Sequence, residues 1–103
     1  MNIFEIIDKL KRKIKFTHER KEHILVRHPE VTEFVLFEKI LLDPDLIRTS
    51  LYDEKVLLYY TDVSKEYKYL VLVVKTLDGE GFILTAYKTN IIKEGKERWK
   101  KKS

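Results

Sequence analysis

The chain of 103 residues lacks cysteine and contains only three glycines, two prolines and one tryptophan. Without cysteine, a disulfide framework, a thiolate metal site and a thiol nucleophile are all excluded. Residues 1–10 mix apolar and charged side chains, a pattern typical of neither a signal peptide nor a membrane span. No stretch rich in glycine, serine or proline divides the chain. We therefore expect one soluble, cytoplasmic domain over residues 1–103, without contact to a membrane.

Basic residues gather toward the two ends of the sequence, although the net charge is only +4. Residues 9–27 hold eight basic and two acidic side chains, whereas residues 28–90 hold seven basic and eleven acidic ones. The C-terminal tail, residues 93–103, is again basic, with six against two. If the two basic ends meet on one face, they would contact a polyanion such as RNA. Two separately solvated surface segments would explain the same charges.

Residues 2–12 are predicted to form a helix that packs against the rest of the domain. Their apolar side chains recur at helical spacing and would line one face: Ile3, Phe4, Ile7 and Leu10. Residues 13–17 then alternate polar and apolar side chains, which predicts a short strand. Thr17 stands where it would cap a following helix.

Two further helices are expected on either side of Pro29. The first covers residues 18–27, and Pro29 ends it because the residue before a proline disfavours helical geometry. The same proline is well placed to begin a helix over residues 30–42. The apolar stripe of this second helix would be Val31, Phe34, Phe37 and Leu41.

The second half of the chain changes to the period of strands. Four strands are predicted, over 46–51, 56–61, 67–76 and 81–89. Asp78-Gly79 lies between the last two and is typical of a hairpin turn. Helices first and hairpin-connected strands afterwards predict an α+β fold, with N-terminal helices followed by a four- to five-stranded antiparallel sheet covered on one side.

Two of the three histidines lie close to Pro29, together with an arginine and a carboxylate. Arg20, His23 and Arg27 fall on one face of the helix predicted over residues 18–27, while His28 and Glu30 flank the proline. Imidazole exchanges protons near neutral pH, so this cluster favours acid–base chemistry on an anion. A solvated helix end followed by a proline explains the same residues equally well.

The last predicted strand offers a second group of candidates. Alternation places Phe82, Leu84 and Ala86 toward the core and Ile83, Thr85 and Tyr87 on the opposite face. The two hydroxyl groups would then be available for phosphate contact or proton donation. Ordinary strand-forming residues on a half-exposed face are the simpler interpretation.

The sequence argues against a metal ion or a bound cofactor. His18, His23 and His28 recur every five residues, which places successive side chains about 140° apart on a helix, so they do not converge on one ion. No glycine-rich phosphate loop or dinucleotide fingerprint is present. An enzyme built from this chain would therefore work without metal and without cofactor.

Taken together, several segments resemble one known family. The segments are His23-Ile-x-x-Arg-His-Pro-Glu30, Leu42-Asp-Pro-Asp-Leu-Ile47, Leu58-Tyr-Tyr60, Val73-Val-Lys75, Gly81-Phe-Ile-Leu-Thr-Ala-Tyr87, Lys93-Glu-Gly-Lys96 and Trp99. This set is similar to the phage-associated branch of the nuclease superfamily that contains barnase, EndoU, colicin and RelE-like ribonucleases. The resemblance covers most of the chain, from about Thr17 to Trp99, and implies a RelE- or barnase-like sheet carrying the active site.

The resemblance implies a metal-independent endoribonuclease, in which the 2′-hydroxyl of RNA attacks the neighbouring phosphate. Such a reaction needs a base, an acid and cations for the developing charge. The expected catalytic residues are His23 or His28 as base, Arg27 and Lys75 as charge stabilisers, Tyr87 as proton donor or stacking platform, Thr85 as phosphate contact and Glu30 as the group that orients a histidine. The expected RNA-binding residues are Arg20, Tyr60, Lys96, Arg98 and Lys100.

Two functions of different classes follow. The first is an RNA-cleaving enzyme, for which a toxin role predicts an acidic antitoxin that covers the basic helix face and the active face of the sheet. The alternative is a non-catalytic RNA- or protein-binding module that has a nuclease-like fold.

Overall fold

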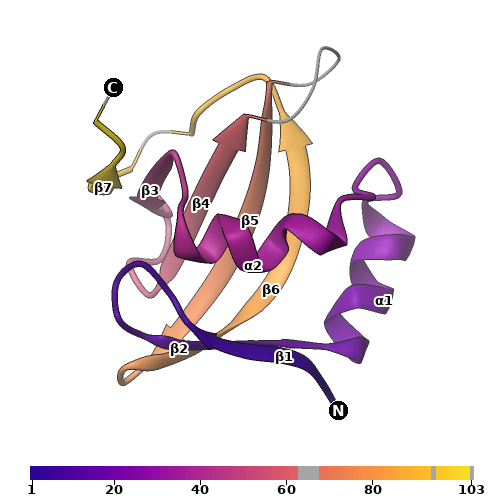
Figure 1. Cartoon of the computed structure of the whole chain (residues 1–103). Helices are drawn as coiled ribbons and strands as arrows, with labels where there is room; N and C mark the ends of the chain where they lie inside the picture. Colours follow the sequence, from indigo (N-terminus) through magenta and orange to yellow (C-terminus); the bar gives the residue numbers. More distant parts are fainter. Residues whose placement is uncertain (63–67, 94, 103) are drawn as a thin grey trace.

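A seven-stranded sheet dominates the computed structural model, which describes residues 1–62, 68–93 and 95–102 (Figure 1). The strand order is β1-β2-β6-β5-β4-β3-β7, and all neighbouring strands are antiparallel except β2 and β6, which are parallel. The strands are β1 (Asn2–Ile7), β2 (Lys13–Thr17), β3 (Leu46–Thr49), β4 (Val56–Asp62), β5 (Tyr69–Leu77), β6 (Glu80–Thr89) and β7 (Glu97–Lys100). The helical elements are α1 (His18–Arg27), the short 3-10 turn η1 (Phe34–Leu36) and α2 (Phe37–Leu42). No helix among the described residues combines the length and apolar character that a membrane crossing requires.

The predicted fold, with N-terminal helices before a four- to five-stranded antiparallel sheet, is wrong. The structure is a mixed sheet of seven strands with two short α-helices in its described part, and the chain enters through a β1–β2 hairpin. Residues 2–12 form strand β1 and a turn instead of a helix. Phe4 and Ile6 pack against the core, whereas Ile3 and Ile7 are exposed. Inward-facing side chains therefore recur every two residues, as in a strand. The β-branched isoleucines favour this extended form.

The helix predicted over residues 30–42 forms only in its second half. The 3-10 turn begins at Phe34, and the α-helix covers only Phe37–Leu42. Before it, the Glu33 carboxylate accepts a hydrogen bond from the Thr32 backbone N–H (3.0 Å), a local bond that competes with helix formation. Of the four residues of the predicted stripe, Val31, Phe37 and Leu41 are fully buried, and Phe34 is partly buried against the core.

Other predicted elements match the structure closely. The strand over residues 13–17 and the helix over 18–27 have the expected bounds, and the Thr17 hydroxyl accepts a hydrogen bond from the Arg20 backbone N–H (3.2 Å). The four later strands are displaced at their ends by no more than two residues, except that Tyr67 lies outside the described residues. Asp78 (φ 44°) and Gly79 (φ 83°) form the predicted hairpin turn.

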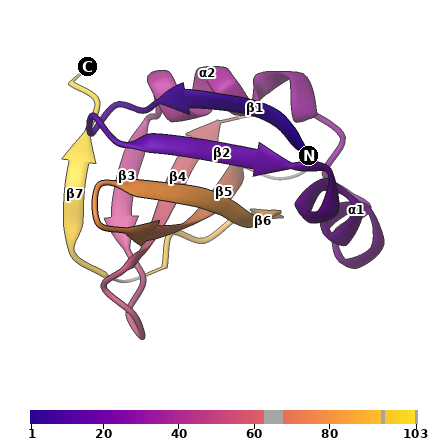
Figure 2. The same cartoon turned by 90° about the horizontal axis from the view of Figure 1, so that it is seen from below.

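The main core lies between one face of the sheet and a cover made of α2 and the N-terminal hairpin (Figures 1 and 2). Alternate residues of the central strands supply it; they include Leu57, Tyr59, Leu70, Leu72 and Val74. From the cover, Phe16 and Phe37 pack with their ring centroids 5.1 Å apart. The opposite face of the sheet is not part of this main core.

We call that opposite side of the sheet the second face. It carries a smaller apolar cluster of Leu46, Leu58, Tyr60, Val71 and Val73. Ile92, which follows β6, packs on this cluster. Among the described residues, no helix contributes to this cluster, and the second face is bordered by loops and, beside Tyr87, by the end of α1.

A bulge in β6 decides which of its side chains reach the second face. Val73 pairs with Thr85 and Val74 with Ile83, so Leu84 is an extra residue. Ile83 joins the main core, while Leu84 packs on the second face. The predicted core positions of Phe82 and Leu84 and the predicted outer position of Ile83 are therefore wrong, because simple alternation ignores the bulge.

The N-terminal hairpin is fastened to the sheet by a buried carboxylate. Asp8 is only 3% exposed, and its side chain accepts a hydrogen bond from the Tyr59 hydroxyl. The other carboxylate oxygen accepts the backbone N–H groups of Leu10 (3.1 Å) and Arg12 (2.7 Å). Burial and the neighbouring carboxylate raise the pKa of Tyr59 far above its ordinary value, so this phenol stays protonated and continues to donate.

Strand β7 approaches β3 so closely that only glycine fits at position 95. A Cβ atom there would lie 2.0 Å from the carbonyl oxygen of Thr49, which is backbone and has little room to move. Beyond this contact, Trp99 pairs with Ile47 and packs on the main core. The position of β7 therefore depends on residue 95 being glycine, which has no Cβ atom.

We predict that Gly95→Ala separates β7 from β3 and lowers the free energy of unfolding by about 1–3 kcal/mol, the usual cost of overpacking. Trp99 is the only tryptophan, so its emission should shift to the red in the native baseline of a urea titration. Gly79→Ala is the matched control: its φ of 83° is unfavourable for alanine, but its Cβ meets no atom within 4 Å. The control should lose stability without the emission shift. Native emission and unchanged stability in Gly95→Ala would contradict this account.

Candidate functional site

Helix α1 takes the place of a strand along the outer edge of β6. Strand β2 pairs with β6 at three positions only, the last of them Phe82, and no other described strand continues that edge. α1 follows β2 directly and lies beside β6 (Figures 1 and 2). The Arg20 side chain donates from Nε to the carbonyl oxygen of Leu84 (2.8 Å), which gives an exposed edge carbonyl a partner.

His28 sits where α1 ends and faces both a carboxylate and an aromatic ring. Its backbone N–H closes the helix on the carbonyl of Ile24 (2.7 Å). Its imidazole Nδ1 lies 3.5 Å from Glu30 Oε2, and the two rings of His28 and Tyr87 have centroids 6.1 Å apart. A carboxylate at Nδ1 fixes the ring and leaves Nε2 to face a ligand.

His23 lies in a field of positive charge on the same helix. Partial desolvation lowers the pKa of His23, and the charges of Arg20, Arg27 and His28 lower it further. Arg20, His23 and Arg27 therefore lie close together on α1 as the helical spacing predicted, and we call this group the basic stripe. Because its pKa is lowered, the His23 imidazole is mainly neutral near pH 7 and able to accept a proton.

Two hydroxyl groups of β6 lie on the second face beside this helix end. The Thr85 and Tyr87 hydroxyl oxygens are buried and have no hydrogen-bond partner among the described residues. Burial raises the pKa of Tyr87, so its phenol is a donor at all physiological pH values. Buried hydroxyls without partners are uncommon in proteins, and a phosphate oxygen or a water would satisfy them.

A pocket of about 300 Å³ opens on the second face beside Tyr87. Leu58 and Val73 contribute apolar surface to its lining, and Tyr52 and Lys93 also border it. The Lys93 ammonium lies 5.1 Å from the centroid of the Tyr87 ring, and its backbone N–H donates to the Tyr60 hydroxyl (3.1 Å). The pocket thus combines an apolar surface, two aromatic rings and a cation, which suits a planar base attached to a phosphate.

A buried ion pair fixes the segment between the helices against β6. Lys88 Nζ lies 2.8 Å from Glu33 Oε2, and both side chains are largely covered. Burial opposes ionisation of Glu33, but its hydrogen bonds, above all the one from Lys88, lower its pKa overall. This contact holds the segment that follows His28 in place.

The structure brings most of the predicted catalytic residues together at the boundary of α1 and β6. We call this group the α1–β6 site: Arg20, His23, Arg27, His28, Glu30, Thr85 and Tyr87. Tyr60 lies next to it, because Tyr60 and Tyr87 both pair with Val71 across the sheet.

Lys75 does not join the α1–β6 site. It lies on the second face, but four residues along β5 from the partner of Tyr87, which corresponds to about 13 Å. Its ammonium is bound to Asp53 Oδ2 at 2.6 Å, and this hydrogen bond lowers the pKa of Asp53. The resemblance implied Lys75 as a charge stabiliser, but the register of β5 places it too far along the strand.

Lys96, Arg98 and Lys100 lie at the opposite edge of the sheet. Arg98 and Lys100 belong to β7, which three strands separate from β6, roughly 19 Å away. At that edge the two basic ends of the sequence do meet, since the Lys9 ammonium lies 4.9 Å from the Trp99 ring centroid. The basic stripe of α1 is not part of that contact.

Sequence reasoning missed Lys93 and Tyr52. Both lie in loops that only the folded chain brings over the second face, and neither belongs to a periodic pattern. The one local signal was a lysine shortly after the end of a strand, which usually marks a solvated surface. Asp8 was missed for a similar reason, since an isolated carboxylate carries no sign of burial.

Comparison with protein-family models, with curated proteins and with solved structures gave no match. Within the described residues, no group of three or more histidine, aspartate or glutamate side chains is arranged to hold a metal ion.

We predict that His23 titrates at a lower pH than an exposed histidine in a proton NMR titration of the three imidazoles. Arg27→Gln removes a positive charge, so the midpoint of His23 should rise toward its ordinary value. Lys39→Gln removes an equal charge from α2, which covers the opposite face, and should leave the midpoint unchanged. If the His23 midpoint in the wild-type protein equals that of an exposed histidine, or does not change in Arg27→Gln, the charges of α1 do not lower the pKa of His23.

Proposed function

We propose that this protein cleaves single-stranded RNA without a metal ion at the α1–β6 site. The observation that carries the proposal is the position of His28, which lies between Glu30 and Tyr87 and near His23, a second imidazole whose pKa is lowered. Two imidazoles in different electrostatic settings are suited to act as an acid and a base in one reaction. The reaction is the one that the resemblance of the sequence to ribonucleases implies for these same residues.

In the proposed reaction, His23 is the base and His28 the acid. The ribose 2′-oxygen forms a bond to the adjacent phosphorus while its proton passes to neutral His23. The bond from phosphorus to the 5′-oxygen breaks, and that oxygen takes a proton from His28, whose positive charge Glu30 balances. The products are a 2′,3′-cyclic phosphate and a free 5′-hydroxyl.

Arg27 and the two hydroxyls of β6 stabilise the phosphate during this step. The Arg27 side chain is exposed and not bound to a carboxylate within the described residues, so it can meet the phosphoryl oxygens. The Tyr87 and Thr85 hydroxyls, which have no hydrogen-bond partner among the described residues, would donate to the phosphate. Lys93 adds a cation at the rim of the pocket that receives a base.

Non-catalytic RNA binding is the second candidate, and the position of Lys75 favours it. With Lys75 held by Asp53, the site has one cation fewer than the sequence suggested for charge stabilisation. In either case an acidic protein segment laid over the α1 stripe would block RNA, which is how an antitoxin would act on this site.

The direct test is cleavage of a labelled RNA oligonucleotide in the presence of EDTA. The wild-type protein should cut it and leave cyclic phosphate ends, and a 2′-deoxy residue at the cut position should prevent cleavage. His23→Ala and His28→Ala should each reduce kcat/KM by about 10²–10⁴-fold, the usual contribution of a general acid or base. His18→Ala is the matched control, because His18 is exposed at the start of α1.

The melting temperatures of the three variants identify losses caused by unfolding. Cleavage that requires a divalent metal, or His23→Ala and His28→Ala variants as active as His18→Ala, would contradict the catalytic proposal. Oligonucleotide binding without product in the wild-type protein would leave the second candidate.

A further inference from the structure

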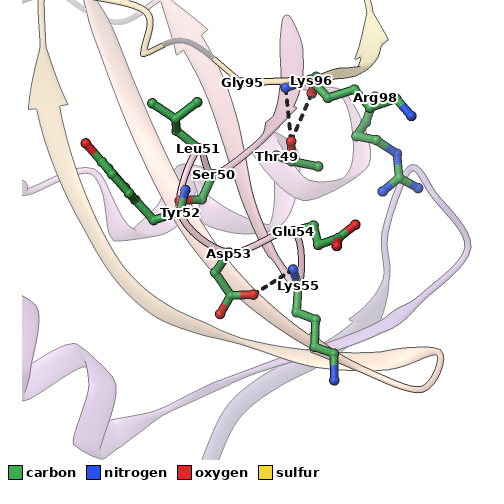
Figure 3. Close-up of a pocket in the computed structure, with 10 residues that line it drawn as sticks. All are labelled: Thr49, Ser50, Leu51, Tyr52, Asp53, Glu54, Lys55, Gly95, Lys96 and Arg98. Atoms are coloured by element: carbon green, nitrogen blue, oxygen red, sulfur yellow. Dashed lines mark hydrogen bonds between the residues drawn. The ribbon is translucent and has the colours of Figure 1, made fainter.

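A second hollow, larger than the pocket at Tyr87, lies at the opposite edge of the sheet (Figure 3). We call it the basic groove: it runs between the β3–β4 loop, residues 50–55, and the segment 95–98, and has a volume of about 870 Å³. Ser50, Leu51 and Tyr52 line both this groove and the pocket at Tyr87. The two hollows are therefore neighbours that share one loop as their common border.

The charges of the groove favour an anion. Lys55, Lys96 and Arg98 line it, and none of them lies within ion-pair distance of a carboxylate among the described residues. Of the two acidic residues in the lining, Asp53 is already bound by Lys75, a residue outside the groove. Among the described residues, three cations outside any ion pair thus line the groove with two carboxylates, one of which is already bound.

The groove is held in shape by the backbone contact that requires Gly95. The Thr49 hydroxyl accepts the Lys96 backbone N–H (3.0 Å), and the Thr49 backbone N–H donates to the Lys96 carbonyl (2.8 Å). Figure 3 shows Lys96 and Arg98 on one side of the groove and the loop with Lys55 on the other. Cations on two fixed walls can contact successive phosphates of one strand without first ordering the backbone.

We propose that the basic groove binds the phosphate backbone of the RNA strand beyond the bond cut at the α1–β6 site. The inference rests on the proposed function and adds to it a path for the substrate. The strand runs from His28 and Tyr87 across the pocket, passes Tyr52 and enters the groove. Tyr52 is 93% exposed at this border, where an aromatic ring can stack on a base of the passing strand.

The test compares long and short probes that cannot be cleaved. Fluorescence anisotropy measures the affinity of 2′-O-methyl RNA of about twelve and about three nucleotides, the longer probe being able to reach both sites. In the triple variant Lys55→Gln, Lys96→Gln, Arg98→Gln, the long probe should bind at least tenfold more weakly. The slope of log Kd against log salt should fall by about 2, since each phosphate contact on a single strand contributes about 0.7.

The short probe reads out the α1–β6 site separately. Its affinity should be the same in the wild-type and triple variant proteins, and Lys39→Gln on α2 should change neither probe. Unshifted Trp99 emission confirms that β7 remains in place. If the triple variant lost affinity for both probes equally, or if its salt slope were unchanged, the inference would be overturned. It would also be overturned if the triple variant bound the long probe as tightly as the wild-type protein does but no longer bound an acidic polyglutamate peptide.

The outcome is independent of catalysis. If the wild-type protein binds the long probe through the groove but cuts no RNA, the catalytic proposal fails and the groove stands. If the protein cuts RNA and the triple variant binds the long probe normally, the groove fails and the catalytic proposal stands.

Discussion

The short parallel pairing of β2 with β6 is the constraint on which the candidate site depends. Because it stops at Phe82, the rest of that edge of β6 is left for α1, which follows β2 without a linker. The Arg20 side chain then donates a hydrogen bond to the Leu84 carbonyl at the edge of β6, and the end of α1 lies beside Tyr87. A longer β2 would pair with the residues of β6 that now face α1. The histidines of α1 would then not lie beside β6.

The sheet can offer a binding surface because its core is built on one side. α2 and the N-terminal hairpin cover that side, and the buried bond between Asp8 and Tyr59 fastens the hairpin to the central strand β4. In the described part of the chain, loops and the end of α1 border the second face, and the pocket there is lined by Tyr52, Tyr87 and Lys93. Structural and functional residues thus alternate along the same strands, and the bulge at Leu84 adjusts their alternation in β6.

Local patterns were sufficient for α1, its Thr17 cap, β2 and the hairpin at Asp78-Gly79. They failed for residues 2–12, because the apolar positions fit a helical stripe as well as a strand in which Phe4 and Ile6 point inward. They also could not predict which strands pair: β2 and β6 are far apart in sequence, and no local signal specifies a parallel contact between them. For the same reason Thr85 and Tyr87 were assigned to one face correctly, while the separation of Lys75, Lys96 and Arg98 from them required the topology.

His23, whose pKa is lowered by partial desolvation and by its basic neighbours, is the proposed base at the α1–β6 site. The most direct measurement is the pH dependence of kcat/KM for RNA cleavage, compared with the NMR titration of His23 in the free protein. The base works only when deprotonated, so its lowered pKa places the rise in activity at a correspondingly low pH. We expect this rise to coincide with the His23 titration and to move to higher pH in Arg27→Gln. A rise that does not follow His23, or that stays fixed in Arg27→Gln, would contradict it.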